Sequence, residues 1–200
     1  MNTEIEVKFL HINHDKIRGR LNETGFVCTV PMRLMRRAII DYSDRRLQSR
    51  KSNSYIRVRD EGDKITLTYK QFDTLSVDGA KEVEVVTSSF EDTIKIFTTI
   101  GLEVVSLQES RRETWKNENC EVVLDEWPWL NPYIEIEGES ETDIREVAKI
   151  LALNWHDAVF GDVMVAYRHQ YPHLTPEQTV GSLSEVRFGA KAPDFLQVSE

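Results

Sequence analysis

Residues 4–9 read Glu-Ile-Glu-Val-Lys-Phe, a strict alternation of charged and apolar side chains. Neighbouring side chains of a β-strand point to opposite faces, so this stretch predicts a strand with one charged and one apolar face. The same alternation returns at residues 54–60, 64–71, 80–87 and 133–138. Such repetition predicts a mainly β protein.

Short turns and helical patterns separate the alternating stretches. Turns such as residues 61–63 join neighbouring strands directly, which favours a mostly antiparallel sheet. Ser88 followed by Glu91, and Ser140 followed by Asp143, resemble residues that cap helix N-termini. Further strands are predicted at residues 33–42, 103–116 and 120–126, and helices at residues 12–24, 88–99, 140–153 and 160–170.

About eight strands are enough to close a barrel whose lumen holds one small ligand. We therefore expect a mainly β (α+β) fold, a single closed antiparallel eight-stranded β-barrel with peripheral helices. The barrel domain should cover residues 1–172, and residues 173–200 should form a polar C-terminal tail. A closed barrel has no edge strand that demands a partner, so the oligomeric state stays open.

Composition excludes several classes of protein. The chain has 200 residues, 40% of them hydrophobic, and a formal net charge of -9, which argues against a duplex nucleic-acid binder. Two cysteines, Cys28 and Cys120, lack the spacing of a disulfide framework or zinc site. We see no signal-peptide pattern and no apolar run of the ~18 residues that a membrane span needs. A cytoplasmic protein without a membrane partner is expected.

The charged strand faces carry the chemistry. Glu-x-Glu occurs in three predicted strands, at residues 4–6, 82–84 and 135–137, and Arg-x-Arg in one, at residues 57–59. A single strand of this kind is usually half-buried with a solvated face. Like charges two residues apart repel, however, and need partners of opposite charge. Their repetition favours charged faces that line a lumen, with helices covering the apolar faces.

Acidic and basic strands in one lumen suit a particular ligand. Carboxylate pairs favour the hard cations Mg²⁺ or Mn²⁺, which prefer oxygen ligands. Arginine and lysine pairs favour phosphate oxygens, which an arginine binds as a two-pronged donor. The sequence therefore predicts a cavity for a metal–polyphosphate complex.

The segment Glu4-Ile5-Glu6-Val7-Lys8 resembles the Glu-x-Glu-x-Lys signature of the CYTH superfamily, the triphosphate tunnel metalloenzymes. That family includes class IV adenylyl cyclases, thiamine triphosphatases and inorganic tripolyphosphatases. Further motifs similar to the family's follow in order within residues 1–165, at residues 41–42, 56–59, 67–70, 81–84, 111–115, 124–126 and 133–140.

The resemblance implies a role for each matching residue. The implied ligands of one divalent metal are Glu4, Glu6, Glu135 and Glu137, with Glu84 and Asp125 as candidates for a second. The residues implied to clamp the phosphates are Arg57, Arg59, Lys70 and Arg112. Lys8 would sit beside the triphosphate as a positioning charge. Ser110 stands where many members have a basic residue, so Arg111 and Arg112 both remain candidates for the lumen, with Arg112 favoured.

The resemblance implies three candidate functions. The first is hydrolysis of inorganic or simple organic triphosphate with Mg²⁺ or Mn²⁺, in which water attacks a phosphoryl group. The second is a class IV adenylyl cyclase, in which the ribose 3′-hydroxyl of ATP attacks the α-phosphate to give cyclic AMP and pyrophosphate. The third is a non-catalytic module that binds polyphosphate or nucleotide. All three expect a small-molecule triphosphate as the partner.

Overall fold

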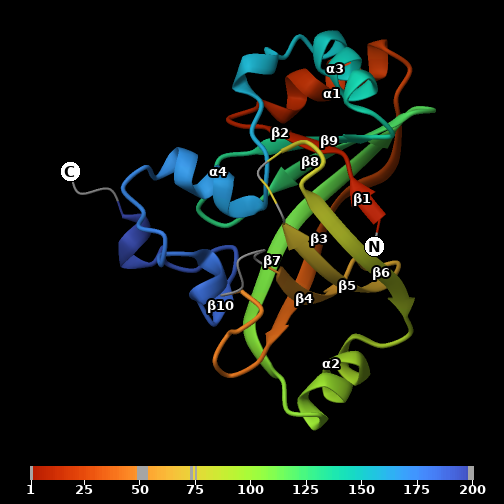
Figure 1. Cartoon of the computed structure of the whole chain (residues 1–200). Helices are drawn as coiled ribbons and strands as arrows, with labels where there is room; N and C mark the ends of the chain where they lie inside the picture. The colour runs from red at the N-terminus through yellow and green to blue at the C-terminus, as the bar shows by residue number, and fades with distance from the viewer. Residues whose placement is uncertain (1, 49–53, 73, 75, 198–200) are drawn as a thin grey trace.

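The computed structural model describes residues 2–48, 54–72, 74 and 76–197. Within them one sheet carries the fold, with α1, α2 and α3 packed on its outer side (Figure 1). The strands are β1 (Asn2–Glu4), β2 (Glu6–Phe9), β3 (Val27–Asp41), β4 (Ser54–Asp60), β5 (Ile65–Phe72), β6 (Ala80–Thr87), β7 (Glu103–Lys116), β8 (Cys120–Glu126), β9 (Tyr133–Gly138) and β10 (Glu185–Val186). The helices are α1 (His14–Glu23), α2 (Phe90–Thr99), α3 (Glu141–Ile150) and α4 (Val163–Gln170), with short 3₁₀ turns at Trp155–Asp157, Val180–Ser182 and Asp194–Leu196.

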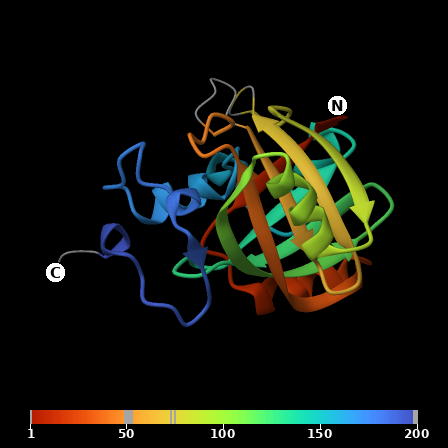
Figure 2. The same cartoon turned by 90° about the horizontal axis from the view of Figure 1, so that it is seen from below.

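The sheet curls because its two longest strands pair along most of their length and twist together. Strand order is β1-β6-β5-β4-β3-β7-β8-β9-β2, and every neighbouring pair along it is antiparallel. The β3–β7 register shifts between Cys28 and Val30, between Val30 and Arg33, and between Ile39 and Ile40. Such irregularities add to the natural strand twist and bend the sheet, and Figure 2 shows its curled outline.

The expected closed barrel is wrong; the sheet is an open, curled half-barrel. Its edges are β1 and β2, which follow each other along the chain on either side of Ile5. The first half of this N-terminal stretch pairs with β6 and the second half with β9. The N–H of Glu6 donates to the Val77 carbonyl, in the connection between β5 and β6, at 3.0 Å. Among the described residues, no β-ladder pairs β1 with β2.

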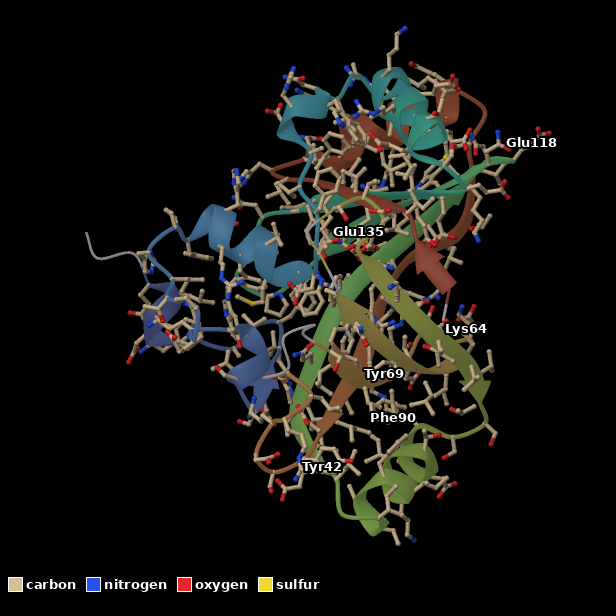
Figure 3. All side chains as sticks on the ribbon, in the orientation of Figure 1. Tyr42, Lys64, Tyr69, Phe90, Glu118 and Glu135 are labelled. Atoms are coloured by element: carbon tan, nitrogen blue, oxygen red, sulfur yellow. The ribbon has the colours of Figure 1, made fainter. Side chains whose placement is uncertain are left out.

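Helices cover the apolar outer face of the sheet, as the alternation predicts. Ile17 and Leu21 of α1 and Ile144 and Val147 of α3 are buried against the apolar residues of β2, β8 and β9. At the other end α2 buries Phe90 on β3 and β4 (Figure 3). No helix among the described residues is long and apolar enough to cross a membrane.

Local capping decides where the helices begin. The Ser140 side chain accepts the Asp143 N–H at the start of α3, as predicted. In α2 the cap is Ser89, whose side chain accepts the Asp92 N–H, so the predicted cap at Ser88 is one residue early. Two serines in succession make the first one an equally plausible cap on sequence grounds.

The chain after residue 172, expected as a polar tail, packs on the sheet. Its side chains Val180, Val186 and Leu196 are buried with Tyr167 of α4. Strand β10 pairs in parallel with β7, opposite Leu107 and Gln108. This segment therefore packs beside α4 and against the sheet.

Glu113 ties α1 to the sheet and gives a test of the fold. Its carboxylate accepts hydrogen bonds from Arg18 at 3.0 Å and from the Trp115 indole at 2.6 Å. Burial opposes ionisation, but these donors hold the pKa of Glu113 below its usual value of 4.5. We expect Glu113→Gln to lower the free energy of unfolding by ~1–3 kcal/mol at neutral pH.

A lowered pKa in the folded state stabilises the fold above the unfolded pKa and loses its effect below it. The difference in unfolding free energy between Glu113→Gln and wild type should therefore shrink as the pH falls below 4.5, which urea titrations at several pH values measure. Glu121→Gln, which removes the partner of the exposed Lys116, is the matched control and should change little. A difference that stays constant with pH would contradict the assignment.

Candidate active site

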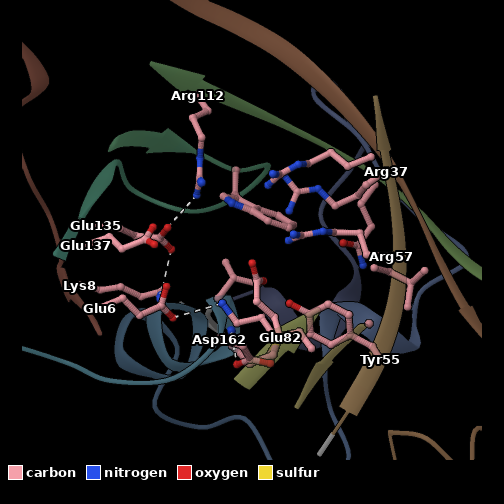
Figure 4. A pocket seen from close by; sticks show the side chains of 18 of the residues that line it. Glu6, Lys8, Arg37, Tyr55, Arg57, Glu82, Arg112, Glu135, Glu137 and Asp162 are labelled. Atoms are coloured by element: carbon pink, nitrogen blue, oxygen red, sulfur yellow. Dashed lines mark hydrogen bonds and ion pairs between the residues drawn. The ribbon is translucent and has the colours of Figure 1, made fainter. Parts of the chain in front are cut away.

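The hollow of the half-barrel contains a cavity of about 770 Å³ (Figure 4). This is a usual size for a small-molecule site. Side chains from every strand from β2 to β9 line it, together with residues of α4 and the segment that follows. The charged strand faces therefore point inward, as the alternation predicts.

Most of the predicted site residues meet in this cavity. Those that line it are Glu6, Lys8, Arg57, Arg59, Lys70, Glu84, Arg112, Glu135 and Glu137. Arg112 faces the cavity, whereas Arg111 lies on the outer face, where it pairs with Glu126. The backbone of Glu4 pairs with Ala80, and its side chain lies outside the described part of the chain.

One end of the cavity, the carboxylate pole, consists of Glu6, Glu135 and Glu137 with the cations that contact them. The Lys8 ammonium lies 3.3 Å from Glu6 and 3.1 Å from Glu135. Lys70 lies 3.6 Å from Glu6. In the β2–β9 ladder Glu6 is directly opposite Glu137, and Lys8 is opposite Glu135. Figure 4 shows Lys8 between the two strands' carboxylates.

Charge pairing favours the ionised forms of Lys8 and Glu135. Burial disfavours the Lys8 charge, but Glu135 and Glu6 outweigh it and raise the Lys8 pKa. Burial likewise opposes ionisation of Glu135, and Lys8 and Arg112 hold its pKa well below the usual range. These groups are therefore charged at neutral pH.

Asp125 and Glu84 occupy different positions from the other carboxylates. Asp125 is fully buried behind Arg112, and both of its oxygens accept from that guanidinium, one of them from Nε at 2.8 Å. Glu84 accepts from the Thr68 hydroxyl at 2.7 Å and lies 3.6 Å from Arg57. Each of them therefore pairs with an arginine, and Arg112 also contacts Glu135.

The opposite side of the cavity, the cationic pole, gathers Arg37, Arg57 and Arg59. Arg59 pairs with Glu61, with 2.9 Å between Nε and Oε1. Burial, followed by repulsion from neighbouring arginines, lowers the pKa of Arg37 to about 9 and that of Arg59 to about 10. Both remain charged at neutral pH, so this pole offers an excess of positive charge to an anion.

The sequence reasoning missed several cavity residues. Arg37, Trp127 and Tyr133 line the cavity, and so does Asp162, which caps α4. Arg37 lies opposite Arg59 in the β3–β4 ladder, which could have pointed to it. The connection between those strands is too long for turn rules to set their register, so that signal was hidden. Burial raises the pKa of Asp162, and Lys8 opposes that effect.

The carboxylate pole fits a divalent metal in its chemistry. Like charges on directly opposed residues, as in Glu6 and Glu137, repel and favour a cation between them. Carboxylate oxygens are the ligands that Mg²⁺ and Mn²⁺ prefer. Among the described side chains, no three His, Cys, Asp or Glu are already gathered as a metal site. Glu6 and Glu137, with Glu135 beside them, could hold such a cation.

Known proteins resemble this chain in sequence. A protein family model described as the CYTH domain matches residues 2–157. A Methanocaldococcus jannaschii protein named "Putative adenylate cyclase" is 28% identical over 150 residues, which cover 74% of this chain and 83% of that protein.

Two solved structures share the fold. A Vibrio parahaemolyticus protein described as a "putative adenylate cyclase" has a TM-score of 0.70 at 14% identity and covers 82% of this chain and 97% of its own. A Hippeastrum protein, described as a "putative adenylyl cyclase" with a dominant triphosphatase activity, has a TM-score of 0.55 at 16% identity. The matched part covers 86% of this chain and 98% of the Hippeastrum chain.

The position of Asp125 yields a prediction that separates a structural role from metal binding. Asp125→Asn removes the charge that opposes the buried Arg112, and breaking such a pair costs about 3–5 kcal/mol. We expect the urea midpoint of metal-free protein to fall accordingly. Glu126→Gln is the control, because Glu126 directly follows Asp125 in β8 and pairs with the exposed Arg111. Unchanged metal-free stability of Asp125→Asn, with weaker metal binding, would instead make Asp125 a metal ligand.

Proposed function

Because the chain belongs to the CYTH domain family, we propose that it is a divalent-metal-dependent enzyme that hydrolyses inorganic or simple organic triphosphate. The observation that carries this proposal is the pairing of a carboxylate pole and a cationic pole within one cavity. A polyphosphate with its metal has the complementary distribution of charge, since the phosphate oxygens are negative and the ion is positive.

The carboxylate pole is the place for the metal. Glu6 and Glu137 would hold Mg²⁺ or Mn²⁺, with Glu135 and the Glu4 side chain as further ligands. When bound, such an ion neutralises charge on phosphate oxygens. Lys8, which already contacts Glu6 and Glu135, keeps these carboxylates oriented toward the cavity and adds a positive charge beside the phosphates.

The arginines and lysines supply most of the chemistry that the protein itself provides. Arg57, Arg59 and Arg112 project fixed N–H donors into the cavity, and Lys70 adds a point charge. Phosphoryl transfer places negative charge on the transferring group, so donors fixed in advance lower the barrier more than mobile ones. A water molecule would attack a phosphorus atom of the triphosphate. The two products would leave with the charge of their phosphate oxygens still neutralised by these groups.

A class IV adenylyl cyclase is the second candidate. The name of the Methanocaldococcus jannaschii relative favours it, while the Hippeastrum protein is described with a dominant triphosphatase activity. The charged residues serve either reaction, because both need a metal and a neutralised triphosphate. Hydrolysis is preferred here since it requires no base-specific pocket beyond these charges.

Products distinguish the candidates. Purified protein would be incubated with tripolyphosphate, ATP or thiamine triphosphate and with Mg²⁺ or Mn²⁺, and phosphate and cyclic AMP would be measured in parallel. Phosphate without cyclic AMP supports the hydrolase. Cyclic AMP with pyrophosphate from ATP replaces it with the cyclase. Metal-dependent binding without either product leaves a non-catalytic binding module.

The carboxylate pole gives a direct mutational test. Glu6→Gln and Glu137→Gln each keep the shape of the side chain but remove a metal ligand, so we expect metal-dependent turnover to fall at least 100-fold, on the order of the loss for one strong electrostatic contact. Glu139→Gln lies two residues along from Glu137 and is exposed outside the cavity, so it should retain activity. Full turnover in Glu6→Gln would exclude this metal site.

A phosphate clamp should act on both binding and turnover. Arg57 faces the cavity and hydrogen-bonds to Thr68 at 3.1 Å. We expect Arg57→Gln to raise KM for tripolyphosphate, lower kcat, or both, because its contact is present in the bound substrate and in the transition state. Steady-state kinetics at saturating metal measure the two effects separately. Unchanged values of both constants would remove Arg57 from the clamp.

A further inference from the structure

Arg37 is a buried cation that the described residues leave without a counter-charge. Its side chain lies deep in the cavity wall, with 7% of the residue exposed. No described carboxylate lies within 4.0 Å of its guanidinium, whereas Arg57, Arg59 and Arg112 each pair with at least one. The buried Nε of Arg37 also has no hydrogen-bond partner among the described groups.

Such an arrangement is unfavourable in the fold alone. Burying a charge without an ion-pair partner is unfavourable, and the three neighbouring arginines repel Arg37 more than Asp125 attracts it. Ordinary packing would favour an apolar side chain at this position. Residues that destabilise the fold in this way are often kept because they serve a ligand.

Two contacts hold the guanidinium in place. Its centre lies 4.4 Å from the centre of the Trp127 ring, a cation–π contact, and Trp127 is itself buried. One terminal nitrogen, Nη2, donates to the Ser110 hydroxyl on β7. An arginine has five N–H donors, so most of them remain for a ligand in a fixed plane. Such a planar, fixed set of donors matches two oxygens of a phosphate.

We propose that Arg37, oriented by Trp127 and Ser110, is a phosphate-binding residue that receives the part of the triphosphate lying away from the carboxylate pole. Figure 4 shows Arg37 across the cavity from Glu135 and Glu137, on the same side as Arg57. A substrate with its metal at the carboxylates would thus extend toward Arg37. This inference rests on the proposed triphosphate ligand and adds a residue that recognises its length and charge.

A binding experiment without turnover tests the proposal. Calorimetric titration of inorganic tripolyphosphate into metal-free protein in EDTA measures affinity when the metal-dependent reaction cannot proceed. We expect Arg37→Gln to weaken binding at least tenfold. Arg37→Lys should also weaken it, because a lysine keeps the charge but not the planar donors. Arg36→Gln is the matched control: Arg36 is the next residue, lies on the outer face and pairs with Asp60, so affinity should stay within about twofold, as for a surface pair.

A second readout separates ligand binding from packing. Tripolyphosphate bound to Arg37 should change the fluorescence of the stacked Trp127, and that change should be absent in Trp127→Phe and in Arg37→Gln. A purely structural Arg37 predicts the reverse pattern, a lower urea midpoint for Arg37→Gln with unchanged affinity. If Arg37→Gln does not fold, the affinity of Arg37→Lys decides.

The outcomes distinguish this inference from the proposed function. Wild-type affinity in both Arg37→Gln and Arg37→Lys would overturn the role of Arg37 and leave the triphosphate ligand standing. No binding of tripolyphosphate by the wild-type protein would overturn both. Weaker binding in the Arg37 variants, with Arg36→Gln unchanged, would establish the subsite.

Discussion

Arg112 contacts the carboxylates of Asp125 and Glu135 and so joins three neighbouring strands, β7, β8 and β9, through one guanidinium. Asp125 could not remain buried and ionised without this partner. Glu135 is positioned in turn to contact Lys8, which contacts Glu6 on the edge strand. The charged wall at this end of the cavity is thus a connected chain of opposite charges that begins at Arg112.

The cavity also explains why the overall charge of the chain says little about its ligand. The formal net charge is -9, yet arginines crowd one side of a cavity whose carboxylates crowd the other. Charges buried in a concave, water-poor site act more strongly than those spread over the surface. A protein with acidic surroundings can therefore still hold a strongly anionic molecule, provided that the arginines are fixed next to it.

Strand alternation predicted much of the site, and the failures have physical causes. Alternation fixes which face a residue takes, so Arg57, Arg59, Glu135 and Glu137 were found from their spacing alone. It does not fix how strands align across a long connection, which hid Arg37 opposite Arg59. Nor does it show where a strand divides, which made the sheet look closed. The packed segment after residue 172 is polar in composition, and a few buried side chains such as Val186 anchor it.

The N-terminal strand divides at Ile5, so its two halves lie at opposite edges of the sheet. The chain itself joins the two edges at Ile5, and Val77 and Lys70 add a hydrogen bond and an ion pair to Glu6. The β2–β9 ladder keeps Glu6 and Glu137 at a constant separation, while Lys70 belongs to the other flank of the sheet. The spacing of Glu6 and Glu137, the proposed metal ligands, therefore depends on one ladder alone, whereas the contact from Lys70 to Glu6 depends on how the two edges meet.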